Sequence, residues 1–311
     1  MTADRLQTQL GSIKLKNPIM LASGTCGYGE ELQDFIDFNR IGGICIKGTT
    51  LEPREGNAPP RIYETPSGML NAIGLQNKGV DEVIRDKLPW LKQFDGLSVW
   101  VNVCGSKAED YVEVCRRICA SKLAHAIELN ISCPNIKEGG IQFCERPESA
   151  AAVTRACVGV SDLPVFVKLS PNVTDPVAIA QAVMEAGAAG LAMINTLVGM
   201  MVDVERKIPR LSTVTGGLSG PAIKPVALAQ IHKVYQRLKV PIVGMGGIET
   251  VEDVLAFALV GAAAIQIGTQ NFVRADTAMT LLAQLEQHLS QKAENFKDNV
   301  GALQQCIPIL E

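Results

Sequence analysis

The sequence predicts an α/β protein folded as one (β/α)₈ TIM barrel with extended loops at the C-terminal face. Three observations support this fold class. Eight short apolar runs punctuate the chain, helix-like segments separate most of them, and 311 residues are enough for eight strand–helix units. Continuous runs of Val, Ile and Leu are typical of strands buried on both faces, as in a parallel sheet. We therefore expect a single barrel domain over residues 1–311.

The expected strands are the eight apolar runs themselves. In chain order they are Pro18–Ser23, Ile44–Thr49, Val99–Val103, Ile127–Ser132, Val165–Ser170, Leu191–Thr196, Pro241–Gly247 and Ala264–Thr269. A doubly wound sheet is the alternative arrangement for alternating strands and helices. It is disfavoured because GTCGYG at residues 24–29 has the wrong spacing for a dinucleotide-binding fingerprint.

The segments between the strands carry helix signals. The expected helices include Ala108–Leu123, Glu148–Val158, Pro176–Ala186, Pro221–Leu238 and Val251–Leu259. Asp175 before Pro176, Gly220 before Pro221 and Thr250 before Val251 are typical helix starts. Residues 51–79 and 197–219 are too long for plain helical connections, so we expect them to build a cover over the substrate at the carboxyl ends of the strands.

Composition excludes several classes of function. The net charge is −3 and no block of like charge occurs, which argues against binding to nucleic acid or an anionic membrane. The first residues lack the apolar core of a signal peptide, and no run reaches the roughly 18 apolar residues needed to span a bilayer. Nine cysteines, an odd number without any CxxC pair, predict neither a disulfide framework nor a local zinc or iron–sulfur site. We expect a cytoplasmic protein without a metal.

Polar residues cluster at the expected carboxyl ends of the strands, where barrel enzymes place their chemistry. These are Ser23, Lys47, Asn102, Asn130 with Cys133, Lys168, Asn195 with Thr196, Gly246 with Gly247, and Gly268 with Thr269. A strand-end asparagine often only caps a turn, and a free cysteine is most often a small buried hydrophobe. Two lysines in apolar strands are harder to explain by packing, because lysine is almost never buried unpaired. The set predicts an anionic, planar ligand that accepts and donates hydrogen bonds.

The glycines after the last two strands predict a phosphate site. Gly246, Gly247 and Gly268 leave backbone N–H groups open to an anion, although tight strand–helix turns would need glycine too. A phosphate here, with two lysines nearer the barrel centre, fits either FMN or pyridoxal phosphate.

These residues resemble the dihydroorotate dehydrogenases, flavin enzymes of pyrimidine synthesis. The resemblance rests on LASGTCGYG, IKGTT, GNAPPRIYETPSGMLNAIGLQN, VNVCG, ELNISCPNIKEGG, VKLSPNVTD, INT, GGLSGPAIKP, GMGGI and IGT, which follow one another from residue 21 to 269. It implies a barrel that holds FMN and stacks dihydroorotate against the flavin.

The resemblance assigns residues to both ligands. The expected FMN contacts are Ser23, Lys47, Gly48, Asn102, Asn130, Lys168, Ile194, Gly220, Gly246, Gly247, Gly268 and Thr269. The expected substrate contacts are Lys47, Asn71, Ala72, Ile73, Gly74, Leu75, Asn130, Asn195 and Thr196. Cys133 is the expected base that removes the C5 proton, while flavin N5 takes the C6 hydride. No histidine is well placed for this role, and Cys26 and Cys104 are rival thiols that we interpret as packing residues.

The chain looks most like class 1, subtype B. Membrane-bound relatives carry serine in place of the catalytic cysteine and an N-terminal membrane extension, and this sequence shows neither. The resemblance implies a homodimer associated with a separate subunit that carries FAD and a 2Fe-2S cluster and passes electrons to NAD. The alternatives are another FMN-dependent pyrimidine oxidoreductase and, from a different class, a Schiff-base aldolase that uses Lys168.

Overall fold

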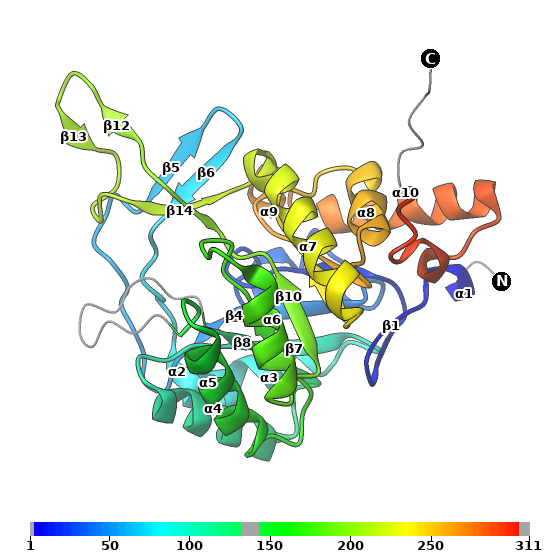
Figure 1. Cartoon of the computed structure of the whole chain (residues 1–311), viewed down its shortest axis with the longest axis horizontal. Coiled ribbons are helices and arrows are strands. Elements are labelled where there is room, and N and C mark those ends of the chain that lie inside the picture. Colours follow the sequence, from blue (N-terminus) through cyan, green and yellow to red (C-terminus); the bar gives the residue numbers. More distant parts are fainter. Residues whose placement is uncertain (1–2, 132–142, 305–311) are drawn as a thin grey trace.

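The structure is a computed structural model that describes residues 3–131 and 143–304. Its centre is a closed barrel of eight parallel strands in the order β3-β4-β7-β8-β9-β10-β15-β16, with β16 pairing back onto β3 (Figure 1). These strands are β3 (Ile19–Leu21), β4 (Gly43–Thr49), β7 (Ser98–Val103), β8 (Ala126–Asn130), β9 (Val165–Lys168), β10 (Gly190–Met193), β15 (Ile242–Gly244) and β16 (Ala264–Ile267). The predicted TIM barrel is therefore confirmed, and each of the eight expected runs contributes one strand.

Several strands stop earlier than the apolar runs suggest. The run Leu191–Thr196 forms a strand only to Met193, and Pro241–Gly247 only to Gly244. At the carboxyl ends the chain leaves the sheet while its composition is still apolar. The residues beyond these strand ends are the ones that line the cavity described below.

Helices surround the barrel in the expected places. The longer ones are α4 (Ala108–Ser121), α5 (Pro147–Val158), α6 (Pro176–Glu185), α7 (Lys224–Leu238), α8 (Val251–Leu259) and α10 (Thr277–Lys292), and the shorter ones are α1 (Ala3–Leu6), α2 (Gly79–Glu82), α3 (Leu88–Leu91) and α9 (Gln270–Val273). The Asp175 carboxylate accepts a hydrogen bond from the Val177 N–H at the start of α6, and Thr250 and Asp253 form a capping box on α8. The predicted helix at Pro221–Leu238 begins as a short 3₁₀ turn, Pro221–Ile223.

The two long connections form a small sheet outside the barrel. β5 (Ile62–Thr65), β6 (Gly68–Asn71), β11 (Leu197–Gly199) and β14 (Gly216–Ser219) pair in the order β11-β14-β6-β5. A short hairpin, β12 (Val202–Asp203) with β13 (Ile208–Pro209), extends from the same connection. In Figure 1 these hairpins project together on the side away from both termini. The predicted excursions exist and pair with each other, although the sequence did not indicate their strands.

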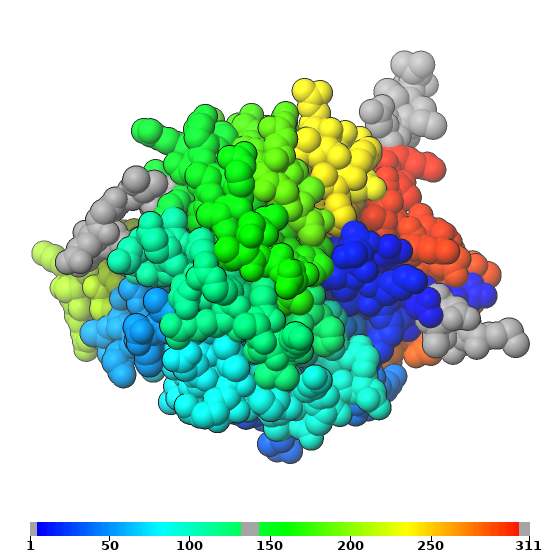
Figure 2. Space-filling model, turned by 90° about the horizontal axis from the view of Figure 1, so that it is seen from below, coloured from blue at the N-terminus to red at the C-terminus, as the bar shows by residue number. Residues whose placement is uncertain are grey.

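The opposite end of the barrel is closed by the start of the chain. The hairpin of β1 (Thr8–Leu10) and β2 (Ile13–Leu15) places Leu10 and Leu15 against the apolar barrel interior, where Trp100 and Phe166 pack with ring centroids 4.6 Å apart. Figure 2 shows the N-terminal segment in blue beside the C-terminal helix in orange and red, and α1 contacts α10. Because this end is filled with apolar side chains, the chemistry is confined to the other end.

No helix in residues 3–131 or 143–304 is long and apolar enough to cross a membrane. The expected cytoplasmic location stays a prediction.

Candidate active site

A cavity of about 810 Å³ opens at the carboxyl ends of the barrel strands. The strand-end residues on its wall are Ser23, Lys47, Gly48, Asn102, Asn130, Lys168, Ile194, Asn195, Thr196, Gly246, Gly247, Gly268 and Thr269. The outer sheet and its loops add Asn71, Ala72, Ile73, Gly74, Leu75 and Gly220. Every residue predicted to contact FMN or substrate lies on this one cavity, and their roles stay predictions. Cys133 lies outside the described residues.

The barrel interior changes from apolar to polar just below the cavity. Cys45, Trp100, Ala126, Phe166 and Ala264 form part of a buried apolar layer. Two residues further along the same strands stand Lys47, Asn102, Glu128, Lys168 and Gln266. Side chains on one face of a strand recur every second residue, so these five form the next layer towards the cavity. The strand alternation therefore produces a polar floor.

Glu128 is the centre of that floor. Its fully buried carboxylate accepts hydrogen bonds from Asn102 Nδ2 at 2.6 Å, from Lys168 Nζ at 3.0 Å and from Gln266 Nε2 at 2.9 Å. Burial alone lowers the pKa of Lys168, but the charge of Glu128 outweighs it, so the pKa of Lys168 lies above its ordinary value. Lys168 is therefore a fixed ammonium ion at the wall of the cavity.

Three asparagines continue this network upward into the cavity. Asn130 Nδ2 donates to Asn102 Oδ1 at 3.4 Å, and Asn195 Nδ2 donates to Asn130 Oδ1 at 3.3 Å. They come from β7, from the end of β8 and from the loop after β10, and all three line the cavity. Amide groups offer one acceptor and two donors each, which suits recognition of an imide-like ring.

Lys47 is the second lysine of the cavity wall. Burial lowers the pKa of Lys47, the nearby Arg61 lowers it further, and Cys26 and Glu31 act in the opposite direction. Within the described residues no carboxylate lies within ion-pair distance of its ammonium group, whereas Lys168 has Glu128. Lys47 is therefore a cation available to an anionic ligand.

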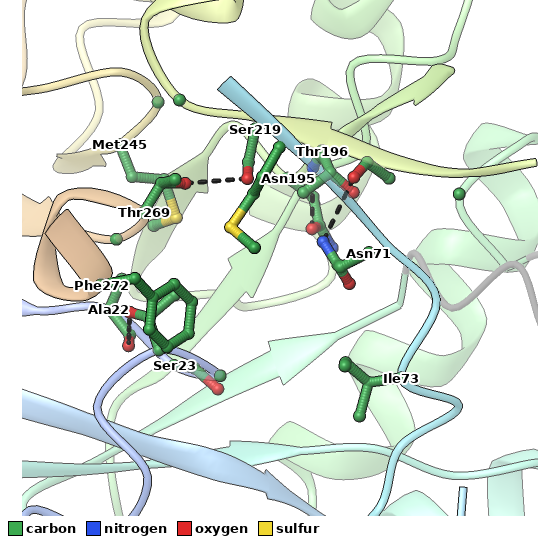
Figure 3. Close-up of a pocket in the computed structure, with 18 of the residues that line it drawn as sticks. Ala22, Ser23, Asn71, Ile73, Asn195, Thr196, Ser219, Met245, Thr269 and Phe272 are labelled. Atoms are coloured by element: carbon green, nitrogen blue, oxygen red, sulfur yellow. Dashed lines mark hydrogen bonds between the residues drawn. The ribbon is translucent and has the colours of Figure 1, made fainter. Parts of the chain in front are cut away.

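The glycine loops after β15 and β16 form one end of the cavity. Gly246 and Gly247 have φ values of +125° and +78°, which favour glycine. Within the described part of the chain, no backbone hydrogen bond is donated by the N–H groups of Gly246, Gly247, Gly268 and Thr269. Figure 3 shows Thr269 beside Ser219, to which its hydroxyl donates a 2.8 Å hydrogen bond. Free N–H groups and small residues at this end fit a phosphate group.

The opposite wall is the inner face of the outer sheet. Asn71 Nδ2 donates to the Gly217 carbonyl at 3.2 Å, which ties β6 to β14, and Asn172 Nδ2 donates to the Thr196 carbonyl at 3.0 Å. In Figure 3 Asn71, Asn195 and Thr196 lie together on one side of the cavity, and Ile73 lies on the strand-like segment that crosses it. The wall thus brings amide and hydroxyl groups over the polar floor.

Comparisons with known proteins agree with one another. The family model described as "Dihydroorotate dehydrogenase" matches residues 5–289. The chain is 55% identical over 282 residues to a protein of Anoxybacillus flavithermus named "Dihydroorotate dehydrogenase B (NAD(+)), catalytic subunit", covering 91% of this chain and 90% of that one. A protein of the same name from Geobacillus kaustophilus is 52% identical and covers 98% of this chain and 95% of its own.

The chain belongs to the dihydroorotate dehydrogenase family. The crystal structure of DHODH from Eimeria tenella in complex with ferulenol has a TM-score of 0.81 with this fold at 22% identity, and the match covers 96% of this chain and 88% of that one. At that identity the likeness supports the barrel fold alone.

Family membership does not identify the base, so the other thiols and the histidines need separate comparison. Cys26 is buried, its Sγ donates to the Cys45 carbonyl at 3.2 Å, and burial raises its pKa to about 12. Cys104 is also buried and donates to Asn102 Oδ1 at 3.2 Å. None of the three histidines of the chain is on the cavity wall. Both rival thiols are packing residues, as the sequence predicted.

Sequence reasoning missed several polar residues of this dihydroorotate dehydrogenase. Glu128 and Gln266 belong to the polar layer below the cavity and are hydrogen-bonded to each other. The other missed residues line the cavity: Thr25, Arg61, Asn172 and Asn271. A signal existed for Glu128, because a glutamate in an apolar strand is almost never fully buried without a partner, and Lys168 stands in the neighbouring strand. No comparable signal marked Asn271, whose buried Oδ1 has no hydrogen-bond partner among the described residues.

Proposed function

We propose that this chain is the catalytic subunit of a dihydroorotate dehydrogenase that oxidises dihydroorotate to orotate in de novo pyrimidine biosynthesis, with NAD as the final electron acceptor. The observation that carries the proposal is the 55% identity to a relative of that name together with a polar cavity lined by the predicted ligand residues. In this proposal residues 1–311 form one FMN-binding barrel domain.

The cavity has the features that FMN requires. The unpaired N–H groups of the glycine loops fit the phosphate, and Asn102, Asn130 and Lys168 offer donors and acceptors to a planar ring nearer the barrel axis. Asn271 also lines the cavity, and its Oδ1, which has no hydrogen-bond partner among the described residues, is an acceptor suited to a hydroxyl of the ribityl chain. When bound, FMN supplies the hydride acceptor of the reaction at N5.

The chain's own residues bind the substrate and move the proton. Asn71, Asn130, Asn195 and Thr196 hold the dihydroorotate ring by hydrogen bonds, and Lys47 pairs with its carboxylate. Cys133 takes the proton from C5. Lys168, kept as an ammonium ion by Glu128, would stabilise the negative charge that a flavin in this cavity gains as it accepts electrons.

The Schiff-base alternative is not favoured by the state of Lys168. A lysine nucleophile must lose its proton, and therefore needs a depressed pKa. The pKa of Lys168 is instead raised in the presence of the Glu128 carboxylate, 3.0 Å away. Lys168 is better suited to hold an anion than to attack a carbonyl group.

Electrons then leave through a partner. The relatives' name, "catalytic subunit", motivates a second subunit, which we propose to carry FAD and a 2Fe-2S cluster beside a homodimer of this chain.

The experiment that tests the function compares two substrates. The purified chain is mixed with dihydroorotate or with dihydrouracil, which lacks the carboxylate, and a dye reports electron release. We expect dye reduction with dihydroorotate only, and FMN as the flavin released on denaturation. Faster turnover of dihydrouracil would favour the other pyrimidine oxidoreductases and overturn the proposal.

A further inference from the structure

Glu128 lies one layer below the cavity and is not part of its wall. Asn130 is two residues further along β8, about 7 Å towards the cavity, and does line it. Among the described residues, Glu128 reaches the cavity wall through Asn102 and Lys168, while its other polar neighbours, Gln266 and Cys45, are buried away from that wall. Any influence on the reaction must therefore pass through these side chains.

A carboxylate constrains its neighbours because it only accepts hydrogen bonds. Asn102 must turn its NH₂ group towards Glu128, so its carbonyl oxygen faces Asn130. Asn130 then donates to that oxygen and turns its own carbonyl to Asn195. One buried carboxylate thereby orients the amides of Asn102 and Asn130, whereas the Asn195 amide is also oriented by the Thr196 N–H, which donates to its Oδ1 at 2.8 Å.

Gln266 shows how strong this constraint is. Its Nε2 donates to Glu128 Oε2 at 2.9 Å, while its buried Oε1 has no hydrogen-bond partner among the described residues. An unpaired buried carbonyl is unfavourable, so the orientation is dictated by the carboxylate rather than by the glutamine's other neighbours.

We propose that Glu128 is a positioning residue, which holds Lys168 as an ammonium ion and fixes the hydrogen-bonding direction of Asn102 and Asn130 at the cavity. This inference deepens the proposed function and rests on it for the identity of the ligands. The Glu128–Lys168 ion pair and the hydrogen bonds between the asparagines are observed whatever the ligands are.

The test uses four forms of the purified, flavin-loaded enzyme: native, Glu128→Gln, Lys168→Met and the double variant. Glutamine keeps the shape of the side chain but removes the charge and can donate a hydrogen bond. Thr154→Val is a matched control, because Thr154 is buried on α5, away from the cavity, and among the described residues its hydroxyl donates only to the Ala150 carbonyl. Each form is examined by thermal unfolding, by redox titration of the flavin with dithionite, and by its rate of bleaching with dihydroorotate.

We expect Glu128→Gln to slow bleaching by about 10- to 100-fold, the range for a small misplacement of reacting groups. Its flavin potential rises near neutral pH, because the Lys168 ammonium loses the opposing negative charge of Glu128. It then falls more steeply with pH than the native potential, because Lys168 without its partner loses its proton more readily. The titratable groups around the Lys168 ammonium are Glu128 on β8, Cys45 on β4 and Cys104 after β7, so the thiols remain as neighbours in the variant. The double variant loses the added pH dependence of Glu128→Gln, since that dependence comes from the proton of Lys168.

Thermal unfolding measures the coupling between Glu128 and Lys168 as a change in protein stability, independently of the flavin. At pH 7 Glu128→Gln is destabilised because it leaves a buried ammonium unpaired, and the double variant recovers most of the loss. The loss shrinks as pH approaches 10, because the unpaired lysine has a folded pKa below its unfolded value of about 10.4, and protonation then favours the unfolded chain.

Several results decide against the proposal. The proposal is overturned if Glu128→Gln has the same flavin potential, pH profile and bleaching rate as Thr154→Val. It is also overturned if the effects of Glu128→Gln and Lys168→Met on these quantities sum to the effect of the double variant. If Glu128→Gln fails to fold and the double variant folds, the coupling is confirmed; if both fail, Glu128 serves the fold alone. Failure of the native chain to bleach with dihydroorotate would instead count against the proposed function, while the unfolding cycle would still decide the role of Glu128.

Discussion

At the scale of single residues, the chain separates its thiols by environment. Cys26 and Cys104 are buried in packing positions, and burial holds the pKa of Cys26 at about 12. A thiol with so high a pKa is protonated at neutral pH and cannot act as a base. Cys133, in the SCPN segment after β8, is the thiol that remains to be tested by substitution.

Cys133→Ser is expected to slow flavin reduction by dihydroorotate about 10²–10⁴-fold near neutral pH, the usual effect of losing a general base. A serine hydroxyl ionises far less readily than a thiol of ordinary pKa about 8.5. The native rate rises with pH until the thiol is ionised, and the serine variant responds only at higher pH. Anaerobic stopped-flow absorbance at the flavin band measures both profiles.

Cys26→Ala is the control for this experiment, because Cys26 also follows a strand end and lines the cavity. It should bleach at a rate close to native. If Cys133→Ser and Cys133→Ala bleach normally while Cys26→Ala does not, the base has been assigned to the wrong thiol.

At the scale of elements, the loops that follow the barrel strands determine the shape and the hydrogen-bonding groups of the cavity. In the part of the chain that the structure describes, the loops after β15 and β16 leave N–H groups without backbone partners, and glycine permits the positive φ values of Gly246 and Gly247. The two loops differ in how an added methyl group would fit. At Gly247 a Cβ would stand 2.7 Å from the Gly220 carbonyl, whereas at Gly268 its nearest neighbour is Ala22 Cβ at 3.7 Å.

Gly268→Ala therefore tests the phosphate site without disturbing the fold. Since the methyl group has ordinary room in the ligand-free protein, we expect unchanged unfolding of the flavin-free chain. The FMN dissociation constant should rise roughly tenfold or more, equivalent to about 1.4 kcal/mol, because the methyl group occupies space that the phosphate needs. Flavin fluorescence titration measures this constant, and unchanged affinity would place the phosphate elsewhere.

Much of the element order could be predicted because buried parallel strands are continuous apolar runs. All eight barrel strands and five helices follow the predicted segments. The outer sheet could not be predicted, because β5, β6, β11 and β14 are only three or four residues long, Leu70 is their one buried residue, and glycine stands in β6, β11 and β14. β5 pairs with β6 and β11 pairs with β14 within each connection. The four-stranded sheet is completed only by the pairing of β6 with β14, where Asn71 and Gly217 are 146 residues apart in the chain.

The site was predictable to a similar degree and for related reasons. Residues at strand ends, such as Lys47 and Asn195, are found by counting along apolar runs. Glu128 was missed because its partners, Asn102, Lys168 and Gln266, come from three other strands. A sequence shows the composition of each strand but not which side chains face one another across the barrel.

At the scale of the whole molecule, the barrel and outer sheet enclose a cavity of about 810 Å³, which we propose holds one flavin and one substrate. The proposed route to NAD needs a second subunit. The chain shows no dinucleotide fingerprint after its first strand. We therefore expect the single chain to reduce an artificial dye at the expense of dihydroorotate but to form NADH very slowly. Absorbance at the NADH band measures this directly. Rapid NADH formation by the chain alone would contradict the two-subunit arrangement and leave the barrel chemistry intact.

The central claim is that this barrel itself removes a hydride and a proton from dihydroorotate. Its most direct test is an anaerobic single turnover, in which the flavin-loaded chain is mixed with excess dihydroorotate and quenched for product analysis. The account predicts complete bleaching of the flavin and one orotate formed per flavin. A flavin that dithionite reduces but dihydroorotate does not, with no orotate formed, would contradict it.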